Sequence, residues 1–364
     1  MKKRKVALVI LCMVLVFTAI AAGTYSVLRH MGKERLRKSI VTETRIEIES
    51  EEPAGAKELK EGQLRHKGRV YELNEDLITI LMMGIDKESL SADGSATEST
   101  TGSTTEAAGE AEDNLAGGQA DALFLLVIDP HTEEIKIVAI NRNTMTAVDT
   151  WDREGNYLGT FQKQIALQHG YGDGREESCE RQANAVSRLF LGIPINGYVA
   201  IGMDAIEELN DAVGGVEVTV LEDVGGWAKK YGIHEGDVVT LTGEQAYEYV
   251  RNRDWSLVDS NERRLKRQKQ YLTAFVPAVK RTIAGNVGTA MGLYDVLSDH
   301  MVTDVDLSEF TYMATEFMDY HVDVENIVSP KGKIMEGDEF KEYYLVKKSL
   351  EDLIVELFYE EVPE

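Results

Sequence analysis

Arginine residues are concentrated in one short stretch of the chain, where five of them and one glutamine fall within eighteen positions. They are Arg251, Arg253, Arg263, Arg264, Arg267 and Gln268. The planar guanidinium group of arginine keeps its charge and donates paired hydrogen bonds that match phosphate oxygens. On a helix, Arg264 and Gln268 share one face, with Arg267 beside them. In an extended stretch, Arg251 and Arg253 point the same way. The spacing favours a site for a phosphate-bearing anion.

These arginines have a second interpretation, in which they form the solvated face of an amphipathic helix. Asp254, Asp259 and Glu262 lie close enough in sequence to pair with them. Other catalytic patterns are missing from the sequence: it has no glycine-rich phosphate loop with its lysine, no serine-elbow motif and no pair of histidines at helical spacing. His131 and His169 are isolated, and we interpret both as structural or solvent-exposed residues.

Charged side chains also occur at the ends of predicted strands. Asp86 follows one apolar segment, Asp121 begins the next, and Arg142 ends the hairpin partner of that second segment. Ligand sites in α/β sheets favour such strand ends. Magnesium takes oxygen ligands and usually also contacts phosphate. Asp86 and Asp121 are therefore candidate ligands of a Mg²⁺ ion beside the arginines.

The elements that must position these side chains are strands alternating with helices. The predicted strands are 77–83, 122–128, 135–140, 197–202, 216–220 and 324–328, and the predicted helices are 177–191, 203–213, 243–250, 260–280, 307–318 and one at the C-terminus. Short apolar runs between turn residues favour buried strands, and glycine or proline ends several of the helices. The alternation predicts an α/β fold, a layered α-β-α sandwich with a central mixed sheet.

The N-terminus predicts a membrane anchor. Residues 1–5 are a basic cytoplasmic tail, and residues 6–28 contain no charged side chain. A helix of that length spans roughly 34 Å, close to the hydrocarbon thickness of a bilayer. A cleaved signal peptide is the alternative, but the apolar run is long for one. We therefore expect one N-terminal transmembrane helix, with the large domain on the outer side of the cell membrane.

The rest of the chain divides into a stalk and one domain. Residues 29–69 are highly charged and read as a juxtamembrane stalk, and the domain is predicted to span 70–364. Within it, residues 89–118 are rich in Ser, Thr, Gly, Ala and Glu, so we expect a disordered insertion there.

Overall charge limits the possible partners. The 364 residues carry a net charge of -24, which would repel the phosphate backbone of a nucleic acid. An anionic ligand must therefore be held by a local basic cluster against the field of the whole molecule. The two cysteines, Cys12 and Cys179, offer neither a disulfide framework nor a metal-ligand spacing.

Taken together, these segments resemble the LytR-CpsA-Psr family of cell-wall glycopolymer ligases. The matching pieces, in the family's order, are ILMMGID (80–86), QADALFLLVIDPHTEEIKIVAINRNT (119–144), GYVAIGMDAIEELNDAVGGVEVTV (197–220), LTGEQAYEYVRNR (241–253) and RLKRQ (264–268). The resemblance covers roughly residues 77–282, and the run from Leu241 to Gln268 is its most specific part.

The resemblance implies a phosphotransferase that takes a glycopolymer from a polyprenyl-pyrophosphate carrier and attaches it to peptidoglycan through a phosphodiester, assisted by Mg²⁺. It also implies an apolar tunnel for the lipid tail. Asp86 and Asp121 match positions linked to metal binding and catalysis, and Arg142 is a candidate for both catalysis and pyrophosphate binding. The remaining candidates for pyrophosphate binding are Arg251, Arg253, Arg264, Arg267 and Gln268.

The sequence departs from the family pattern at three positions. Gln119 stands where an arginine is usual, Asn143 where a carboxylate is usual, and Gln164 where a lysine is usual. Lost positive charge should weaken the binding of pyrophosphate. Two alternatives to the ligase therefore stay open: a non-catalytic regulatory module that binds polyprenyl phosphates, and a hydrolase that acts on the pyrophosphate of the carrier.

Overall fold

The computed structural model describes most of the chain beyond residue 24. The described residues are 25–48, 58–60, 62–87, 90, 115–152, 154–203, 205–223, 226–254, 256–257, 259–283, 287–298, 300–337 and 340–363. The predicted tail, most of the predicted anchor and most of the predicted insertion lie outside these residues. Among the described residues, no helix combines the length and the apolar character needed to cross a membrane.

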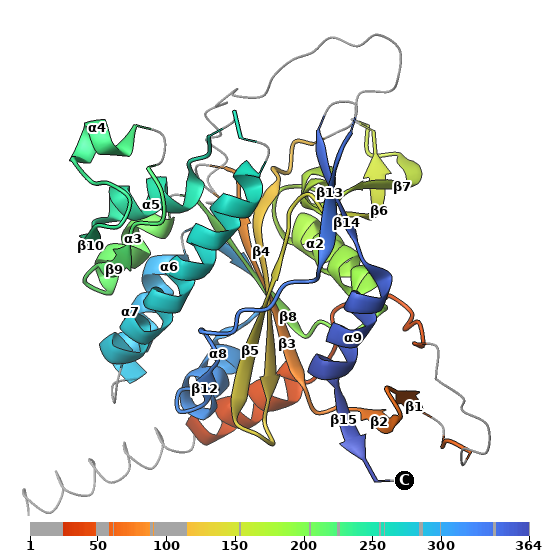
Figure 1. Ribbon diagram of the computed structural model, residues 1–364. Coiled ribbons are helices and arrows are strands. Elements are labelled where there is room, and N and C mark those ends of the chain that lie inside the picture. Colours follow the sequence, from red (N-terminus) through yellow and green to blue (C-terminus); the bar gives the residue numbers. More distant parts are fainter. Residues whose placement is uncertain are drawn as a thin grey trace, which may run out of the picture.

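A mixed sheet of six strands forms the centre of the domain (Figure 1). Its order is β11 (Met301–Thr303), β8 (Gly197–Gly202), β3 (Ile78–Ile85), β4 (Ala120–Asp129), β5 (Glu134–Ile140) and β12 (His321–Val322). The pairs β3–β8 and β5–β12 are parallel, and the other neighbours are antiparallel. The α/β class and the central mixed sheet are therefore as the sequence predicts.

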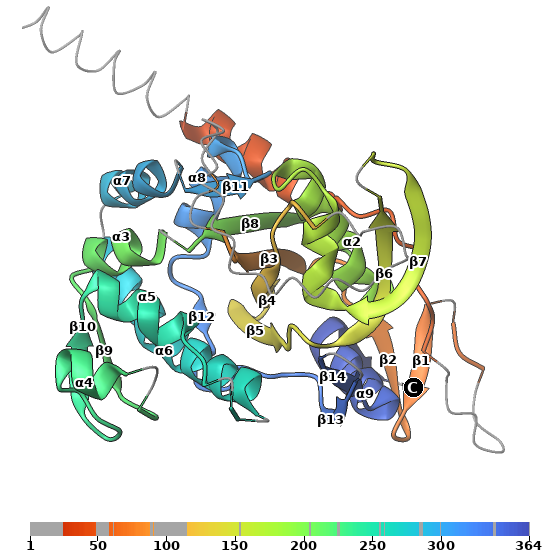
Figure 2. The same ribbon diagram turned by 90° about the horizontal axis from the view of Figure 1, so that it is seen from above.

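Both faces of this sheet are apolar, because its strands carry aliphatic side chains at consecutive positions that point alternately to opposite sides. Leu81 and Met83 lie in the core that α2 (Glu176–Leu189) and α9 (Lys347–Phe358) cover. On the other face, Phe124 packs with Met82 and with residues of α6 (Ser260–Ile283). Figure 2 shows the sheet between these two helical layers.

A compact group of elements packs against α6 and has a core of its own. It comprises α3 (Ala205–Ala212), β9 (Val216–Thr219), α4 (Trp227–Tyr231), β10 (Val238–Leu241) and α5 (Gly243–Arg251). Trp227 and Tyr249 are buried at its centre. Helix α5 begins at a capping box, in which the Thr242 hydroxyl accepts from the backbone N–H of Gln245 and the Gln245 side chain accepts from that of Thr242. The helices α7 (Val287–Ser298) and α8 (Leu307–Glu316) follow α6.

Several elements were not predicted from the sequence. They are α4, β10, α7 and β11, together with the hairpin of β6 (Met145–Trp151) and β7 (Tyr157–Gln164), the 3-10 helix Ile165–Tyr171, the hairpin of β13 (Gly332–Glu336) and β14 (Lys341–Leu345), and the small sheet of β1 (Gln63–His66), β2 (Arg69–Leu73) and β15 (Tyr359–Val362). Both strands of the first hairpin carry polar residues on both faces, so the sequence shows no clean alternation there.

The predicted strand at 324–328 is absent from the structure. Only His321–Val322 forms β12, and Val328 contributes one isolated bridge to Val138. Between them, side chains of α6 donate hydrogen bonds to the backbone. Thr273 donates to the carbonyl of Val324 at 2.8 Å, and Lys269 donates to that of Ile327 at 2.9 Å. These contacts attach the segment after β12 to α6.

Described residues of the predicted stalk pack against the domain. Residues 25–36 are helical, and Leu36 is fully buried. The backbone of Ile40 donates to the carbonyl of Ile195 at 2.8 Å, and β1 and β2 join β15 near the C-terminus. The folded structure therefore begins before residue 70, because apolar residues within the charged segment supply contacts that its average composition hides.

Candidate functional site

Asp121 lies at an irregularity in the central sheet. Gly84 of β3 pairs with Ala122, whereas the next residue, Ile85, pairs with Ala120, so Asp121 is an extra residue in β4. Such a β-bulge re-aims side chains locally. Ala120 belongs to the core under α2, but Asp121 and Ala122 both line a cavity on the opposite face. The bulge therefore turns a carboxylate toward α6.

The Asp121 carboxylate lies between two guanidinium groups. Arg264 Nη1 is 2.5 Å from its Oδ2, and Arg142 forms an ion pair with its Oδ1. The side chains of Asp121 and Arg264 are 12% and 4% exposed. Burial alone would raise the pKa of Asp121, but the attraction of Arg142 and Arg264 outweighs it and holds that pKa below its ordinary value. Asp121 is therefore a fixed negative charge.

The positive charge around Asp121 exceeds what one carboxylate can neutralise. Arg253 is close enough for burial, together with repulsion from Arg264 and Arg142, to lower its pKa to about 10. Within the described part of the chain, the Nε of Arg142 is buried without a hydrogen-bond partner. Buried donors are normally paired. The cluster thus has spare charge and a spare donor, which suits an anion with several oxygens.

The edge of this cluster is more open. Arg251, the last residue of α5, lies 3.8 Å from the Asp86 carboxylate, and both side chains are more than four-tenths exposed. The backbone N–H of Asp86 donates to the carbonyl of Gln119 at 2.9 Å, which ties the two acidic segments together. Because Arg251 ends a helix, the extended stretch that the sequence suggested for this pair is wrong for Arg251, and Arg253 follows outside the helix.

Asp86 and Asp121 fit a magnesium ion only when a ligand completes its coordination. Within the range that the structure describes, no group of three or more His, Cys, Asp or Glu side chains could hold a metal ion. Mg²⁺ commonly binds through one or two carboxylates together with substrate phosphates and water. The two carboxylates match that donor set, so the residues are compatible with a metal that arrives with a phosphate ligand.

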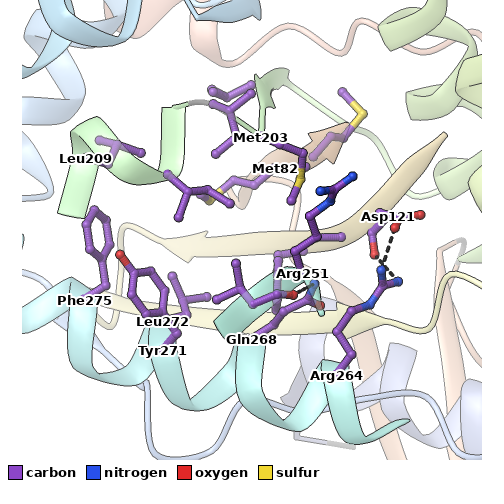
Figure 3. A pocket seen from close by; sticks show the side chains of 18 residues that line it. Met82, Asp121, Met203, Leu209, Arg251, Arg264, Gln268, Tyr271, Leu272 and Phe275 are labelled. Carbon is purple, nitrogen blue, oxygen red and sulfur yellow. Dashed lines mark hydrogen bonds and ion pairs between the residues drawn. The ribbon is translucent and has the colours of Figure 1, made fainter. Parts of the chain in front are cut away.

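An apolar cavity of about 150 Å³ extends from the cluster between the sheet and the helices α3, α5 and α6. It is lined by Met82, Met83, Gly84, Asp121, Ala122, Phe124, Val199, Ile201, Met203, Ile206, Leu209, Val250, Arg251, Arg264, Gln268, Tyr271, Leu272 and Phe275. Figure 3 shows Asp121, Arg264 and Arg251 at one end and Leu209 and Phe275 at the other. The site therefore joins a charged end to an apolar channel. Pockets for drug-sized ligands usually exceed about 300 Å³, so this cavity is smaller than such a pocket.

The structure brings most of the predicted site residues together. Arg142 and Arg264 contact Asp121, Arg253 lies close by, and Arg251 and Gln268 line the cavity. The interpretation as a solvated face is wrong for Arg264, which is buried. It is correct for Arg263, which is about four-tenths exposed and pairs with Asp259 at 3.0 Å.

Arg267 does not lie with the other predicted ligand residues. Its side chain is 1% exposed and pairs with Glu222 at 2.9 Å, on the side of α6 away from the cavity. Its neighbour Gln268 keeps only partial access, because its amide donates to the carbonyl of Val250 at 3.2 Å. Sequence spacing predicted that Arg267 lies beside Arg264 and Gln268 at the ligand site. Its guanidinium group instead donates to the carbonyls of Tyr249 and Asn252 at the end of α5.

Most residues that form the apolar cavity carry no signal in the sequence that would mark them as cavity-lining. Met82, Ala122 and Phe124 alternate with residues of the opposite core, and the period of two along β3 and β4 was the available signal. The pattern of these strands shows that both of their faces are buried. It does not show that a cavity remains between one face and the helices.

The three departures noted in the sequence have different structural roles. Gln119 accepts a hydrogen bond from the guanidinium group of Arg142 and so belongs to the cluster. The carbonyl of Asn143 accepts from the backbone of Tyr343 at 2.9 Å, and the Gln164 side chain donates to the carbonyl of Lys341 at 2.8 Å. The latter two positions thus join the start of β6 and the end of β7 to β14.

Comparison with known proteins identifies the family. The family model described as the LytR_cpsA_psr family matches residues 39–357. The chain belongs to this family. The match begins well before residue 70, in agreement with the packing of the segment that was predicted to be a stalk.

Two relatives in the LytR_cpsA_psr family carry transferase names. Over 199 residues, the chain is 28% identical to the polyisoprenyl-teichoic acid–peptidoglycan teichoic acid transferase TagU of Halalkalibacterium halodurans, which covers 54% of this chain and 59% of that protein. It is 27% identical over 197 residues to the transferase TagV of Bacillus subtilis, covering 53% and 46% of the two chains. The chain therefore spans less than two-thirds of the length of these relatives.

Solved structures show the same fold. The crystal structure of B. subtilis TagV matches with a TM-score of 0.55 and 22% identity, over 77% of this chain and 95% of that one. A structure described as TagT bound to LI-WTA matches with a TM-score of 0.54 and 19% identity, over 77% and 89%. At these identities the likeness establishes the LytR_cpsA_psr fold.

Proposed function

We propose that this protein transfers a glycopolymer from a polyprenyl-pyrophosphate carrier to peptidoglycan. The observation that carries the proposal is the excess positive charge around Asp121 at the end of an apolar cavity. A pyrophosphate needs several fixed donors, and a polyprenyl chain needs an apolar sheath. The transferase names of the two relatives agree with this combination.

In the proposed reaction, a sugar hydroxyl of peptidoglycan attacks the phosphorus that bears the glycopolymer. A new phosphorus–oxygen bond forms, the bridging bond of the pyrophosphate breaks, and polyprenyl monophosphate leaves. The hydroxyl proton passes to a carboxylate, for which Asp86 is the accessible candidate because its side chain is 49% exposed. The product is a phosphodiester.

The arginines would stabilise the charge that develops on the transferred phosphoryl group and on the leaving phosphate. Arg142 and Arg264 are already held in place by Asp121, so little reorganisation is needed when the ligand enters. Mg²⁺ held by Asp86 and Asp121 would supply further neutralisation of the phosphate oxygens. Asp121 then acts by fixing donors rather than by accepting a proton, because its arginine partners favour its charged form.

The cellular setting of the proposal follows from the sequence. An uncharged segment at 6–28 would anchor the chain in the cell membrane, with the domain on the outer side, where carrier lipid and peptidoglycan meet. The carrier, its glycan, peptidoglycan and the membrane are thus the proposed partners, and nucleic acid is not among them.

The test uses the full chain in detergent with a lipid-pyrophosphate-linked glycan, peptidoglycan and Mg²⁺. Attachment of glycan to peptidoglycan together with release of polyprenyl phosphate is the expected result. Binding of the carrier without release would instead identify a regulatory binding module, an alternative that Gln119 and Asn143 keep open. Release without acceptor would identify a hydrolase. Absence of both binding and release would overturn all three.

A further inference from the structure

The C-terminal end of α5 is held by side chains of another helix. The last carbonyls of a helix have no partner within it. Here the guanidinium group of Arg267 donates to the carbonyl oxygens of Tyr249 and Asn252. The amide of Gln268 donates to the intervening carbonyl of Val250 at 3.2 Å. Two neighbouring residues of α6 therefore cap the end of α5. Arg251 is the last residue of that helix, and Arg253 follows it in the chain.

Glu222 fixes the orientation of this capping arginine. It lies in the loop after β9, and its Oε1 accepts from the Nε of Arg267 at 2.9 Å, while its Oε2 pairs with Arg263 at 3.2 Å. A guanidinium group that is 1% exposed requires such a partner, because burial of an unpaired charge is strongly unfavourable. Glu222 lines no part of the cavity beside Asp121, so it has no direct contact with that site.

The turn held in this way carries like charges into a crowded cluster. Arg251 faces Asp86, and Arg253 is repelled by Arg142 and Arg264. Repulsion of this kind would move a loosely held turn away from the cluster until an anion arrived. Capping of the turn by a buried ion pair on its other side opposes that movement.

We propose that Glu222 is a positioning residue, which acts through Arg267 to hold Arg251 and Arg253 against the anion site. The proposal rests on the function proposed above and adds a residue outside the cavity to the machinery that binds pyrophosphate. Placement of donors within about 1 Å of their working positions commonly changes rates or affinities by about tenfold to a hundredfold.

The sign of one measurement separates this role from a general effect of charge. Replacement of Glu222 by alanine removes a negative charge near the arginines, and by electrostatics alone the affinity for an anion should rise. Loss of positioning should instead lower it. We expect Glu222→Ala to weaken the binding of inorganic pyrophosphate by about tenfold or more in calorimetric titrations of the full chain in detergent.

Two further variants make the result specific. Glu244→Ala removes an exposed carboxylate of α5 that pairs with Lys230 at 2.9 Å, changes the net charge equally and should leave the affinity the same or slightly higher. Glu222→Gln keeps the oxygen that accepts from Arg267, so it should recover part of the lost affinity. A thermal melt of each variant identifies any variant that is unfolded at the titration temperature. If Glu222→Ala is unfolded, the affinity of Glu222→Gln for pyrophosphate is compared with that of the unaltered protein.

The outcomes distinguish the two proposals. If the unaltered protein binds no pyrophosphate, the proposed function fails and the role of Glu222 fails with it. If the unaltered protein binds and folded Glu222→Ala binds equally well or more tightly, the positioning role alone is overturned. If Glu222→Ala is unfolded, tighter binding by Glu222→Gln than by the unaltered protein overturns it instead. Weaker binding by the alanine variant, with partial recovery by glutamine, supports it.

Discussion

Arg264 reaches across from α6 to Asp121 of β4, with 2.5 Å between its Nη1 and the carboxylate Oδ2. The two residues are 143 positions apart in sequence. Their contact joins the helix that carries the arginine cluster to the bulge in the sheet, and it closes the charged end of the cavity. Because Arg142 contacts the other carboxylate oxygen, one aspartate holds two of the proposed pyrophosphate donors.

Asp121→Asn should destabilise the protein when no anion is bound. The change leaves Arg142, Arg253 and Arg264 without their shared counter-charge, and breaking a buried ion pair costs about 3–5 kcal/mol. An added anion replaces the lost charge, so inorganic pyrophosphate should raise the melting temperature of the variant by more than it raises that of the unaltered protein.

The matched control for this change is Asp259→Asn, which removes a half-exposed carboxylate that pairs with Arg263. Exposed pairs contribute little because water and salt screen them, so this variant should melt close to the unaltered protein. Equal stability of the two variants would show that Asp121 is not the counter-ion of the cluster.

Gln119→Arg should strengthen the binding of anions and lower the stability of the protein when no anion is bound. The Gln119 side chain accepts a hydrogen bond from Arg142, and an arginine there would instead add a like charge. We expect about a tenfold gain in affinity for inorganic pyrophosphate, because one charge-assisted hydrogen bond contributes about 1.5–3 kcal/mol. Titration calorimetry measures the gain, and a lower melting temperature without pyrophosphate should accompany it.

A control for Gln119→Arg is Gln162→Arg on the exposed strand β7, which changes the net charge by the same amount. It should leave the affinity nearly unchanged. A gain as large as that of the first variant would assign the effect to overall charge and not to the cluster.

Filling the cavity should separate the binding of the lipid tail from the binding of pyrophosphate. Leu272 lines the cavity from α6, so Leu272→Trp should exclude an isoprenoid chain. Affinity for geranylgeranyl pyrophosphate should fall by at least about tenfold, since each buried methylene contributes about 0.8 kcal/mol. Affinity for inorganic pyrophosphate should stay the same.

Val238→Trp offers a comparison on an exposed strand, where the same side chain meets solvent and should change neither affinity. If Leu272→Trp lowers the affinity for both ligands equally, the variant has disturbed the arginines. If it lowers neither affinity, the cavity does not hold the lipid tail.

The fold was predictable from sequence where a segment has a clear apolar pattern, either a continuous aliphatic run or a helical period. Strands β3, β4 and β5 are aliphatic at consecutive positions because both of their faces are covered, and α6 shows a helical period over a long stretch. The residue types of β6 and β7 show no such pattern: burial alternates along β6, but the buried Thr146 and Thr150 are polar, and β7 is largely exposed.

The candidate site was predictable in its residue types but not in all of their directions. Asp121 faces the cavity only because a bulge breaks the alternation of β4, and no local pattern announces that bulge. Arg267 shares a helix turn with Arg264 and Gln268, yet it turns toward carbonyls at the end of α5. Its direction depends on where another helix ends in space, which a sequence does not display.

The buried imidazole of His169 should make the protein sensitive to acid. It lies in the core with its Nδ1 3.1 Å from the carbonyl oxygen of Gly118, and burial lowers its pKa from 6.5 to about 4. Between these values the unfolded chain binds a proton that the folded protein does not bind. Stability from this residue is therefore complete above pH 6.5 and is lost as the pH falls toward 4.

Two carboxyl groups act in the opposite direction, so the test must isolate the histidine. Burial raises the pKa of Asp304 to about 6 and that of Glu309 to about 7, and each stabilises the fold at low pH and loses that contribution as the pH rises through these values. Denaturant unfolding at pH 7 and pH 5 should show that His169→Asn removes part of the acid-induced loss of stability. If the variant and the unaltered protein lose equal stability between these pH values, His169 is not a source of the acid sensitivity.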